Sequence, residues 1–421
     1  MIMAGDLNRL ISLDEAQQIV LGKVQTLPSE LVSLEDGGGR VLAKEMRAPI
    51  DEPATTQAAM DGYAVRSADV VSASPERDLL LKVVGLVGPG KPSDYRLKKG
   101  EALGVMTGAS LPEGADAVVP QEMTESISGK VRVMAPVRPG DYLYPVGAEI
   151  RRGQQLIPGG KILRAKELTV LATQGYHRLE VVRQPVVSVL ASGSELKAVD
   201  ERRDLGEVFA SNLHTVSHLV KSCGGVIKSA EIAGDDLQNL TESIYRASQA
   251  DVVVTTGGTG RSEKDLLSAA IASLDGELFF HGVAISPGKQ TIFAQVNKTL
   301  LFGLPGRPVA TYVAFDQLVR PMLLRMMGLS QVFLPEITAT LTNSIRLKGG
   351  TFSFLFSRCT CGPSGPPMVE ALRSTRQGIM AEMLASNGLI KVEPGEKFVE
   401  AGARVRVQLL DLGLDGLSYF D

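Results

Sequence analysis

Apolar residues recur along the chain with spacings that change from one segment to the next. Over residues 13–27 they fall at helical spacing, Ser12 is a suitable N-cap, and glycines 37–39 end the pattern. Residues 47–147 instead carry short β-prone runs between Gly and Pro, which predicts a small β-rich module. Residues 148–183 return to a mixed pattern, with a helix expected over 165–174 and a strand over 178–182.

From residue 185 onward, apolar strand-like runs alternate with amphipathic helical stretches. Strands are expected over 185–191, 226–232, 250–255, 279–285, 291–296 and 299–304. Helices are expected over 211–223, from Asp235-Asp236 onward, over 264–274 and over 308–326, with Ser211 and Asn212 capping the first. This alternation predicts a doubly wound α/β domain with a parallel sheet, whereas residues 331–421 lose it and look β-rich.

Composition and charge exclude several classes of protein. The 421 residues correspond to about three domains at roughly 150 residues each. With 44 basic and 47 acidic side chains the net charge is −3, which argues against a protein that coats nucleic acid or an anionic membrane. Three cysteines do not suit a disulfide framework, and no apolar run approaches about 18 residues. We therefore expect a cytoplasmic protein with no membrane span.

The loops that follow four of the expected strands are rich in glycine, hydroxyl groups and charge. They are residues 192–195, 256–260, 286–289 and 305–308. Ligands of open α/β sheets bind beyond the carboxyl ends of the strands, and glycines let backbone amides approach phosphate closely. Lys289 and Arg307 can neutralise an anion, and the carboxylates of Glu195, Asp235 and Asp265 suit Mg²⁺. A single glycine-rich loop is usually only a turn, and Asp235 can simply cap a helix. Four such loops on one rim of the sheet nevertheless favour a phosphate-bearing ligand.

Two other patterns are weaker candidates for metal sites. His214 and His218 are spaced for one helix face, but they lie opposite its apolar side and no third ligand is apparent, so a solvated face is expected. Cys359 and Cys361 lack a second cysteine pair or a nearby histidine, so alternation on an ordinary strand explains them.

Six stretches, taken together and in order, carry a family resemblance over nearly the whole chain. They are residues 59–64 (AMDGYA), 106–119 (MTGASLPEGADAVV), 192–196 (SGSEL), 257–258 with Glu263 and Asp265, 287–289 (PGK) and 303–306 (GLPG). In these stretches the chain resembles the MoeA/gephyrin E-domain family, the molybdenum insertases of molybdopterin cofactor synthesis.

The resemblance implies a multidomain fold of α/β and β parts. A discontinuous mixed, helical N-terminal domain (1–46 and 148–183) would carry a β-rich inserted domain (47–147). A doubly wound molybdopterin-binding α/β domain (184–330) and a C-terminal β-barrel-like domain (331–421) would follow. The resemblance also implies a homodimer whose active site lies at the subunit interface, with Asp61 and Thr107 directed towards the partner.

The implied reaction is the Mg²⁺-dependent insertion of molybdate into adenylylated molybdopterin, with release of AMP. Asp265, Glu195 and Asp61 would be catalytic, and Asp265, Glu195 and Asp235 would hold the metal. Transient contacts with molybdopterin adenylyltransferase and with molybdoenzyme chaperones are also implied. The residues assigned to cofactor or substrate binding are Thr107, Gly257, Gly258, Pro287, Gly288, Lys289, Pro305, Gly306, Arg307 and Arg358.

The sequence departs from the family pattern around the expected oxyanion pocket. Ser286, Gln290, Arg307 and Ala310 stand where the family usually has lysine, proline, asparagine and serine. Three hypotheses follow: an active insertase, favoured by the retained motifs; a divergent paralogue that binds the cofactor or handles tungstate, with weak or no insertase activity; and a non-enzymatic scaffold, which no specific feature supports.

Overall fold

The computed structural model describes residues 10–91, 93–259, 265–362, 365–372 and 379–410. The chain forms two compact units. One comprises residues 1–31, 39–43 and 180–421, and the other comprises residues 32–38 and 44–179. Each unit has its own main sheet and apolar core.

A six-stranded mixed sheet forms the centre of the first unit, in the order β17-β14-β18-β22-β21-β19. The strands β14 (Val186–Ser192), β17 (Val226–Ala233), β18 (Val252–Thr256) and β22 (Thr299–Leu304) are parallel, as predicted. β21 (Ile292–Val296) runs antiparallel to β22, and β19 (Glu277–His281) runs antiparallel to β21. β19 therefore points the same way as the parallel strands, and β21 alone is reversed.

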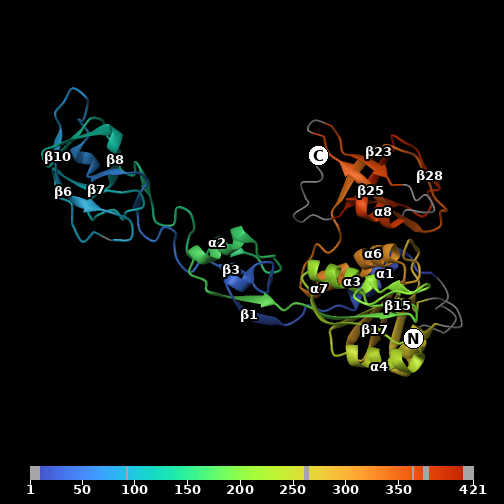
Figure 1. Cartoon of the computed structure of the whole chain (residues 1–421). Helices are drawn as coiled ribbons and strands as arrows, with labels where there is room; N and C mark the ends of the chain where they lie inside the picture. The colour runs from blue at the N-terminus through green and yellow to red at the C-terminus, as the bar shows by residue number, and fades with distance from the viewer. Residues whose placement is uncertain (1–9, 92, 260–264, 363–364, 373–378, 411–421) are drawn as a thin grey trace. The chain divides into compact units, whose positions relative to one another are not determined.

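Helices cover both faces of this sheet, as a doubly wound domain requires (Figure 1). On one face α4 (Leu237–Ala247) and α5 (Leu266–Ser273) bury Leu240, Ile244 and Ile271 against the strands. On the other face α3 (Ser211–Ser222) contacts β14, β17 and β18 and packs against α6 (Pro308–Ala314). A π-helical turn, Phe315–Val319, joins α6 to α7 (Arg320–Met326), so the helix predicted over 308–326 is present but has one wide turn. The predicted helix 13–27 is shorter: α1 spans Leu13–Gly22 and is capped by Ser12.

A closed five-stranded barrel follows, as the β-rich pattern predicted. Its strands are β25 (Phe352–Thr360), β26 (Met368–Ala371), β23 (Glu336–Leu341), β29 (Arg404–Leu409) and β27 (Gly388–Val392), and pairing of β25 with β27 closes it. The short strand β20 (Ile285–Ser286) also pairs with β25, so the chain just before the 286–289 loop is anchored to the barrel. Short pairs β15 (Leu196–Lys197) with β16 (Val208–Phe209) and β24 (Ile345–Arg346) with β28 (Phe398–Val399), and helix α8 (Ile379–Ala385), complete this unit.

The second unit is β-rich. Its main sheet has the order β8 (Ala117–Pro120), β5 (Gly62–Val65), β7 (Glu101–Val105), β6 (Leu80–Val87), β10 (Lys130–Val133) and β9 (Thr124–Ile127). Apolar clusters that include Val65 and Val119, and Ala64 and Val118, form its core. Strand pairs β11 (Leu143–Tyr144) with β4 (Gln57–Ala58) and β12 (Gln155–Ile157) with β3 (Met46–Arg47), and helix α2 (Ala165–Thr173), lie beyond it. The remaining three-stranded sheet, in the order β1 (Ser29–Ser33), β13 (Arg178–Val182) and β2 (Val41–Leu42), lies mainly in the first unit, because residues 29–31, 41–42 and 180–182 belong to that unit.

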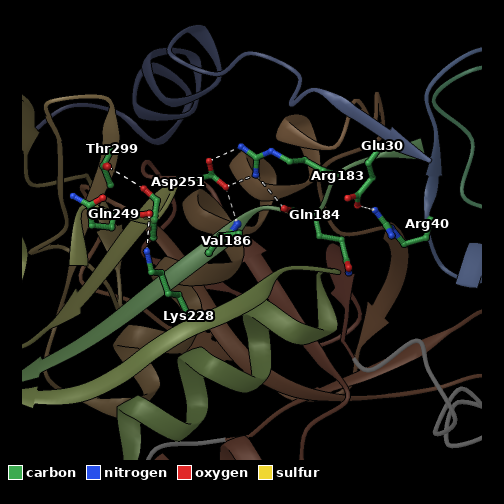
Figure 2. A network of polar contacts seen from close by, with 10 residues as sticks. Glu30, Arg40, Arg183, Gln184, Val186, Lys228, Gln249, Asp251 and Thr299 are labelled. Carbon is green, nitrogen blue, oxygen red and sulfur yellow. Dashed lines mark hydrogen bonds and ion pairs between the residues drawn. The ribbon is translucent and has the colours of Figure 1, made fainter. Parts of the chain in front are cut away.

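Hydrogen bonds hold the amino ends of the parallel strands in register (Figure 2). The Asp251 carboxylate accepts from both Arg183 Nη atoms, at 2.6 and 2.7 Å, and from Val186 N at the start of β14, at 2.8 Å. Burial raises the pKa of Asp251, but the hydrogen bonds from Arg183 and Val186 outweigh it and hold the pKa below its usual value. Thr299 at the start of β22 donates to Ala250 O at 2.9 Å. The opposite, carboxyl edge of the sheet carries the glycine-rich loops after β14, β18 and β22, whereas the loop at 286–289 follows β20, which pairs with the barrel.

Candidate functional site

The strand order reverses between β14 and β18. From β14 the first crossover leads to β17 on one side, and the next leads to β18 on the other. The crevice beyond such a switch point is where open α/β sheets bind ligands. The carboxyl ends of β14, β18 and β22 are level there, because Ala191 pairs with Thr256 and Thr256 pairs with Leu304.

A cavity of about 490 Å³ opens at this switch point. One part of its wall consists of residues from the loops after β14, β18 and β22 and the first turn of α3, and another part is apolar. The lining includes Ser192, Glu195, Leu196, Arg203, Val208, Phe209, Ser211, Asn212, Gly257, Gly306, Arg307 and Met380. The predicted site residues Glu195, Gly257, Gly306 and Arg307 therefore share one cavity.

Gly257 brings two of these loops into direct contact. Its φ is +87°, and a methyl group on its Cα would lie 2.3 Å from Ser192 O. Gly258 also has a positive φ, +66°, but a methyl group there would meet open space. A methyl on Gly306 would lie 3.6 Å from Gly257 Cα. The loops after β14, β18 and β22 thus form one continuous wall, which the glycine at 257 permits.

A second cavity of about 460 Å³ shares Gly306 and Arg307 with the first. It is also lined by Gly288, Lys289, Gln290, Pro305 and Ala310. Neither Lys289 nor Arg307 forms an ion pair with another described residue. Two exposed cations beside exposed backbone suit a small dianion. Five of the residues predicted from the loops at 286–289 and 305–308 meet in this cavity, and Pro287 lies within the first of these loops.

Asp265 caps helix α5 and lies beside a histidine. Its Oδ1 accepts from Ser268 N at 3.1 Å, and its Oδ2 lies 3.3 Å from His281 Nδ1. The ring's Nε2 lies 3.3 Å from Thr259 O, so His281 links Asp265 to the glycine-rich loop after β18. Sequence reasoning missed His281; its position at the carboxyl end of a predicted apolar strand was the available signal. Glu263 lies outside the described residues.

The remaining predicted residues lie elsewhere on the described surface. Asp235 is exposed after β17, next to Asp236, which caps α4 as expected, and Arg358 is exposed on β25 opposite Glu370. Neither of the two cavities is lined by Gly258, Asp235, Asp265 or Arg358. Among the described residues, no three His, Cys, Asp or Glu side chains gather to hold a metal ion. His214 and His218 are exposed, as expected of a solvated face.

Asp61 and Thr107 meet in the second unit. Asp61 Oδ1 accepts from Thr107 N at 2.7 Å and from Thr107 Oγ1 at 2.9 Å. The hydrogen bond from the Thr107 backbone, followed by that from its hydroxyl, lowers the pKa of Asp61. The two residues that the resemblance directs towards the partner therefore form one exposed, hydrogen-bonded pair.

Ser211 and Asn212 were predicted as caps of helix α3, and this was wrong. Ala210 occupies the N-cap position of α3, and Asn212 lies inside the first turn. Its side chain instead donates from Nδ2 to Gly306 O, 94 residues away, at 2.8 Å. Asn212 is therefore part of the cavity wall, a role that a local pattern of capping residues cannot reveal.

Comparison with known proteins identifies the family. Models of the MoeA N-terminal region (domains I and II), a probable molybdopterin binding domain and the MoeA C-terminal region (domain IV) match residues 11–175, 188–325 and 338–410. The chain belongs to the MoeA family. A molybdopterin molybdenumtransferase from Staphylococcus aureus strain COL is 30% identical over 402 residues, which are 95% of this chain and 96% of the relative. One from Staphylococcus epidermidis is 29% identical with the same coverage.

A solved structure has the same architecture. The molybdopterin biosynthesis MoeA protein from Pyrococcus horikosii has a TM-score of 0.85 at 30% identity, covering 96% of this chain and 100% of its own. The predicted family, fold class and enzyme class, a MoeA-type transferase of molybdenum cofactor biosynthesis, are thus confirmed. No helix among the described residues is both long and apolar enough to cross a membrane.

Proposed function

We propose that this MoeA-type enzyme inserts molybdate into adenylylated molybdopterin, with Mg²⁺ and with release of AMP. The observation that carries the proposal is the pair of adjacent cavities that share Gly306 and Arg307. The larger one suits a nucleotide, because its wall combines the backbone of the glycine-rich loops with apolar side chains. The smaller one suits an oxyanion, because Lys289 and Arg307 line it.

Glu195 in the larger cavity and Asp265 at the start of α5 supply carboxylates that suit a Mg²⁺ ion. Mg²⁺ is commonly held by one or two carboxylates together with substrate phosphates, so a cage of three acidic residues is not required. Glu195 lines the cavity, and Asp265 Oδ2, beside His281, has oxygen lone pairs that a metal accepts. Glu195, with Asp265 and Asp235, would hold the ion. When bound, Mg²⁺ would offset charge on the phosphate that leaves with AMP.

The chain's own residues orient the substrate. Backbone amides of the loop at Gly257, which lines the larger cavity, and of Gly258 beside it would bind the phosphates, and Arg307 supplies charge to both cavities. Ser268 N and His281 fix the direction of the Asp265 carboxylate, so that it needs no reorganisation when substrate binds.

An assay of AMP release tests this proposal. Purified protein is incubated with adenylylated molybdopterin, Mg²⁺ and either molybdate or tungstate. We expect oxyanion-dependent AMP release that Asp265→Ala abolishes, because this variant removes the carboxylate that His281 links to the loop after β18. Asp235→Ala changes an exposed carboxylate and is expected to reduce AMP release less. Tight nucleotide binding without AMP release in the presence of either molybdate or tungstate would contradict the proposal.

That outcome would favour a divergent paralogue that binds the cofactor, or handles tungstate, with little insertion. The supporting observation is the lining of the smaller cavity, where Gln290, Arg307 and Ala310 replace the family's usual residues. Ser286, where lysine is usual, immediately precedes the 287–289 segment. Ser286→Lys is expected to raise oxyanion affinity by adding a cation. Unchanged affinity would contradict this view of the position.

We further propose that the enzyme acts as a homodimer, with residues 47–147 of one subunit completing the site formed by residues 184–330 and 331–421 of the other. The support is the exposed Asp61–Thr107 pair, which lies in the unit that lacks both cavities. Mixing Asp61→Ala with Asp265→Ala subunits tests it, since each mixed dimer would regain one complete site. Activity above that of either variant alone is expected, and its absence would contradict a shared site.

A further inference from the structure

Two buried polar atoms in the larger cavity have no hydrogen-bond partner among the described residues. Ser192 and Asn212 are 6% and 8% exposed, and both line the cavity. The atoms in question are Ser192 Oγ and Asn212 Oδ1. Burying a polar atom without a partner destabilises the protein, so such atoms in a cavity wall are commonly completed by a bound molecule.

Gly306 determines which way the Asn212 amide faces. A backbone carbonyl only accepts hydrogen bonds, so the atom 2.8 Å from Gly306 O must be Nδ2. The atom left over is Oδ1, which only accepts. Its partner in the cavity must therefore donate, as a hydroxyl or an amino group does. A fully ionised phosphate or molybdate oxygen cannot fill this role.

The lining indicates which part of a nucleotide lies there. Asn212, Gly306, Gly257 and Ser192 follow one another along the polar wall. The apolar part includes Phe209, whose ring lies 5.4 Å from the Arg203 guanidinium carbon, and this surface suits a planar base. In a nucleotide the sugar lies between base and phosphate, and its hydroxyl groups are donors.

We infer that Asn212 Oδ1 accepts a hydrogen bond from a ribose hydroxyl of the bound nucleotide, with Ser192 Oγ bonding a neighbouring polar group of the same ligand. This inference rests on the proposed function, which supplies the nucleotide. The same Asn212 amide holds the carbonyl of Gly306, next to Arg307 in the wall that the two cavities share. Asn212 is thus a specificity-determining residue that also positions the loop at 305–308.

Affinities of AMP, 2′-deoxy-AMP and 3′-deoxy-AMP, measured by calorimetry, test the inference. For the wild type we expect one deoxy analogue to bind about threefold to tenfold more weakly than AMP, as the loss of one hydrogen bond implies. For Asn212→Ala we expect AMP to weaken and the difference between AMP and that analogue to disappear. Ser217→Ala is the matched control, because Ser217 Oγ is also buried without a partner on α3 but lines a different cavity.

The outcomes separate the inference from the proposed function. Equal affinity of the wild type for AMP and both deoxy analogues overturns the inference, whatever the variants do. Equal weakening of all three ligands by Asn212→Ala also overturns it, because Asn212 would then act only on the loop. If the wild type binds no AMP, the proposed function fails as well.

Discussion

Replacing Gly257 with alanine tests whether the contact between the loops after β14 and β18 is needed for activity. The added methyl group would lie 2.3 Å from Ser192 O, whereas real Cβ atoms essentially never come closer than 3.0 Å. The loops must therefore separate by at least 0.7 Å, the difference between these two distances. The obstacle is backbone on a buried strand end, so it cannot move aside as a flexible side chain can.

Gly258→Ala provides the control for the cost of backbone conformation. Both glycines have positive φ, which costs an alanine about 1 kcal/mol. A methyl on Gly258 meets nothing within 4 Å, so that variant carries the strain without the displacement. The difference between the two variants isolates the effect of moving the cavity wall.

The assay is AMP release from adenylylated molybdopterin at saturating molybdate, together with the affinity for AMP. A displacement near 1 Å can lower a rate by about 10²-fold, so we expect a loss of roughly 30-fold to 100-fold for Gly257→Ala. The expected loss for Gly258→Ala is below about threefold, since its strain acts mainly on stability. Equal activity of the two variants would refute the argument that this close approach shapes the site.

Three further predictions follow from the described contacts. Asp251→Asn should lower the free energy of unfolding by about 2 kcal/mol, between the values for exposed and buried ion pairs. Because the pKa of Asp251 is lowered, this loss of stability should be complete above about pH 4 and shrink as the pH falls through the lowered pKa. Chemical denaturation that shows the same loss at pH 2 would contradict it. Thr107→Val should raise the pKa of Asp61 part of the way to its usual value, because the hydrogen bond from the Thr107 backbone remains while the one from its hydroxyl is lost. An Asp61 titration curve, measured by NMR, that is the same in both proteins would count against this. Burial raises the pKa of Cys223 to about 12, so iodoacetamide at pH 8 should modify the partly exposed Cys361 first; mass spectrometry that finds Cys223 labelled first would exclude this order.

The residues that could be predicted are those whose signal is local. A glycine-rich loop after an apolar strand is visible in the sequence, and the rule for open sheets puts such loops on one edge; Glu195, Gly257, Lys289 and Arg307 were found in this way. The antiparallel direction of β21 could also have been predicted from the sequence. Only residues 297 and 298 separate it from β22, and a parallel connection needs about a dozen residues.

The residues that could not be predicted depend on contacts between distant segments. Asn212 follows a plausible helix start, so its sequence context favours a cap, while its actual partner is 94 residues away. His281 reads as the end of an apolar strand until Asp265 is placed beside it. The shared lining of the two cavities by Arg307 likewise appears only when the loops are assembled.

The ratio of AMP released to metal incorporated tests the central claim most directly. It is measured in one reaction of the wild-type enzyme with adenylylated molybdopterin, Mg²⁺ and molybdate, with nucleotide followed by chromatography and cofactor-bound molybdenum by elemental analysis. The account predicts about one AMP for each molybdenum inserted, and little of either without oxyanion, since the two cavities meet at Gly306 and Arg307. AMP release that proceeds equally without molybdate and leaves the cofactor free of metal would contradict it.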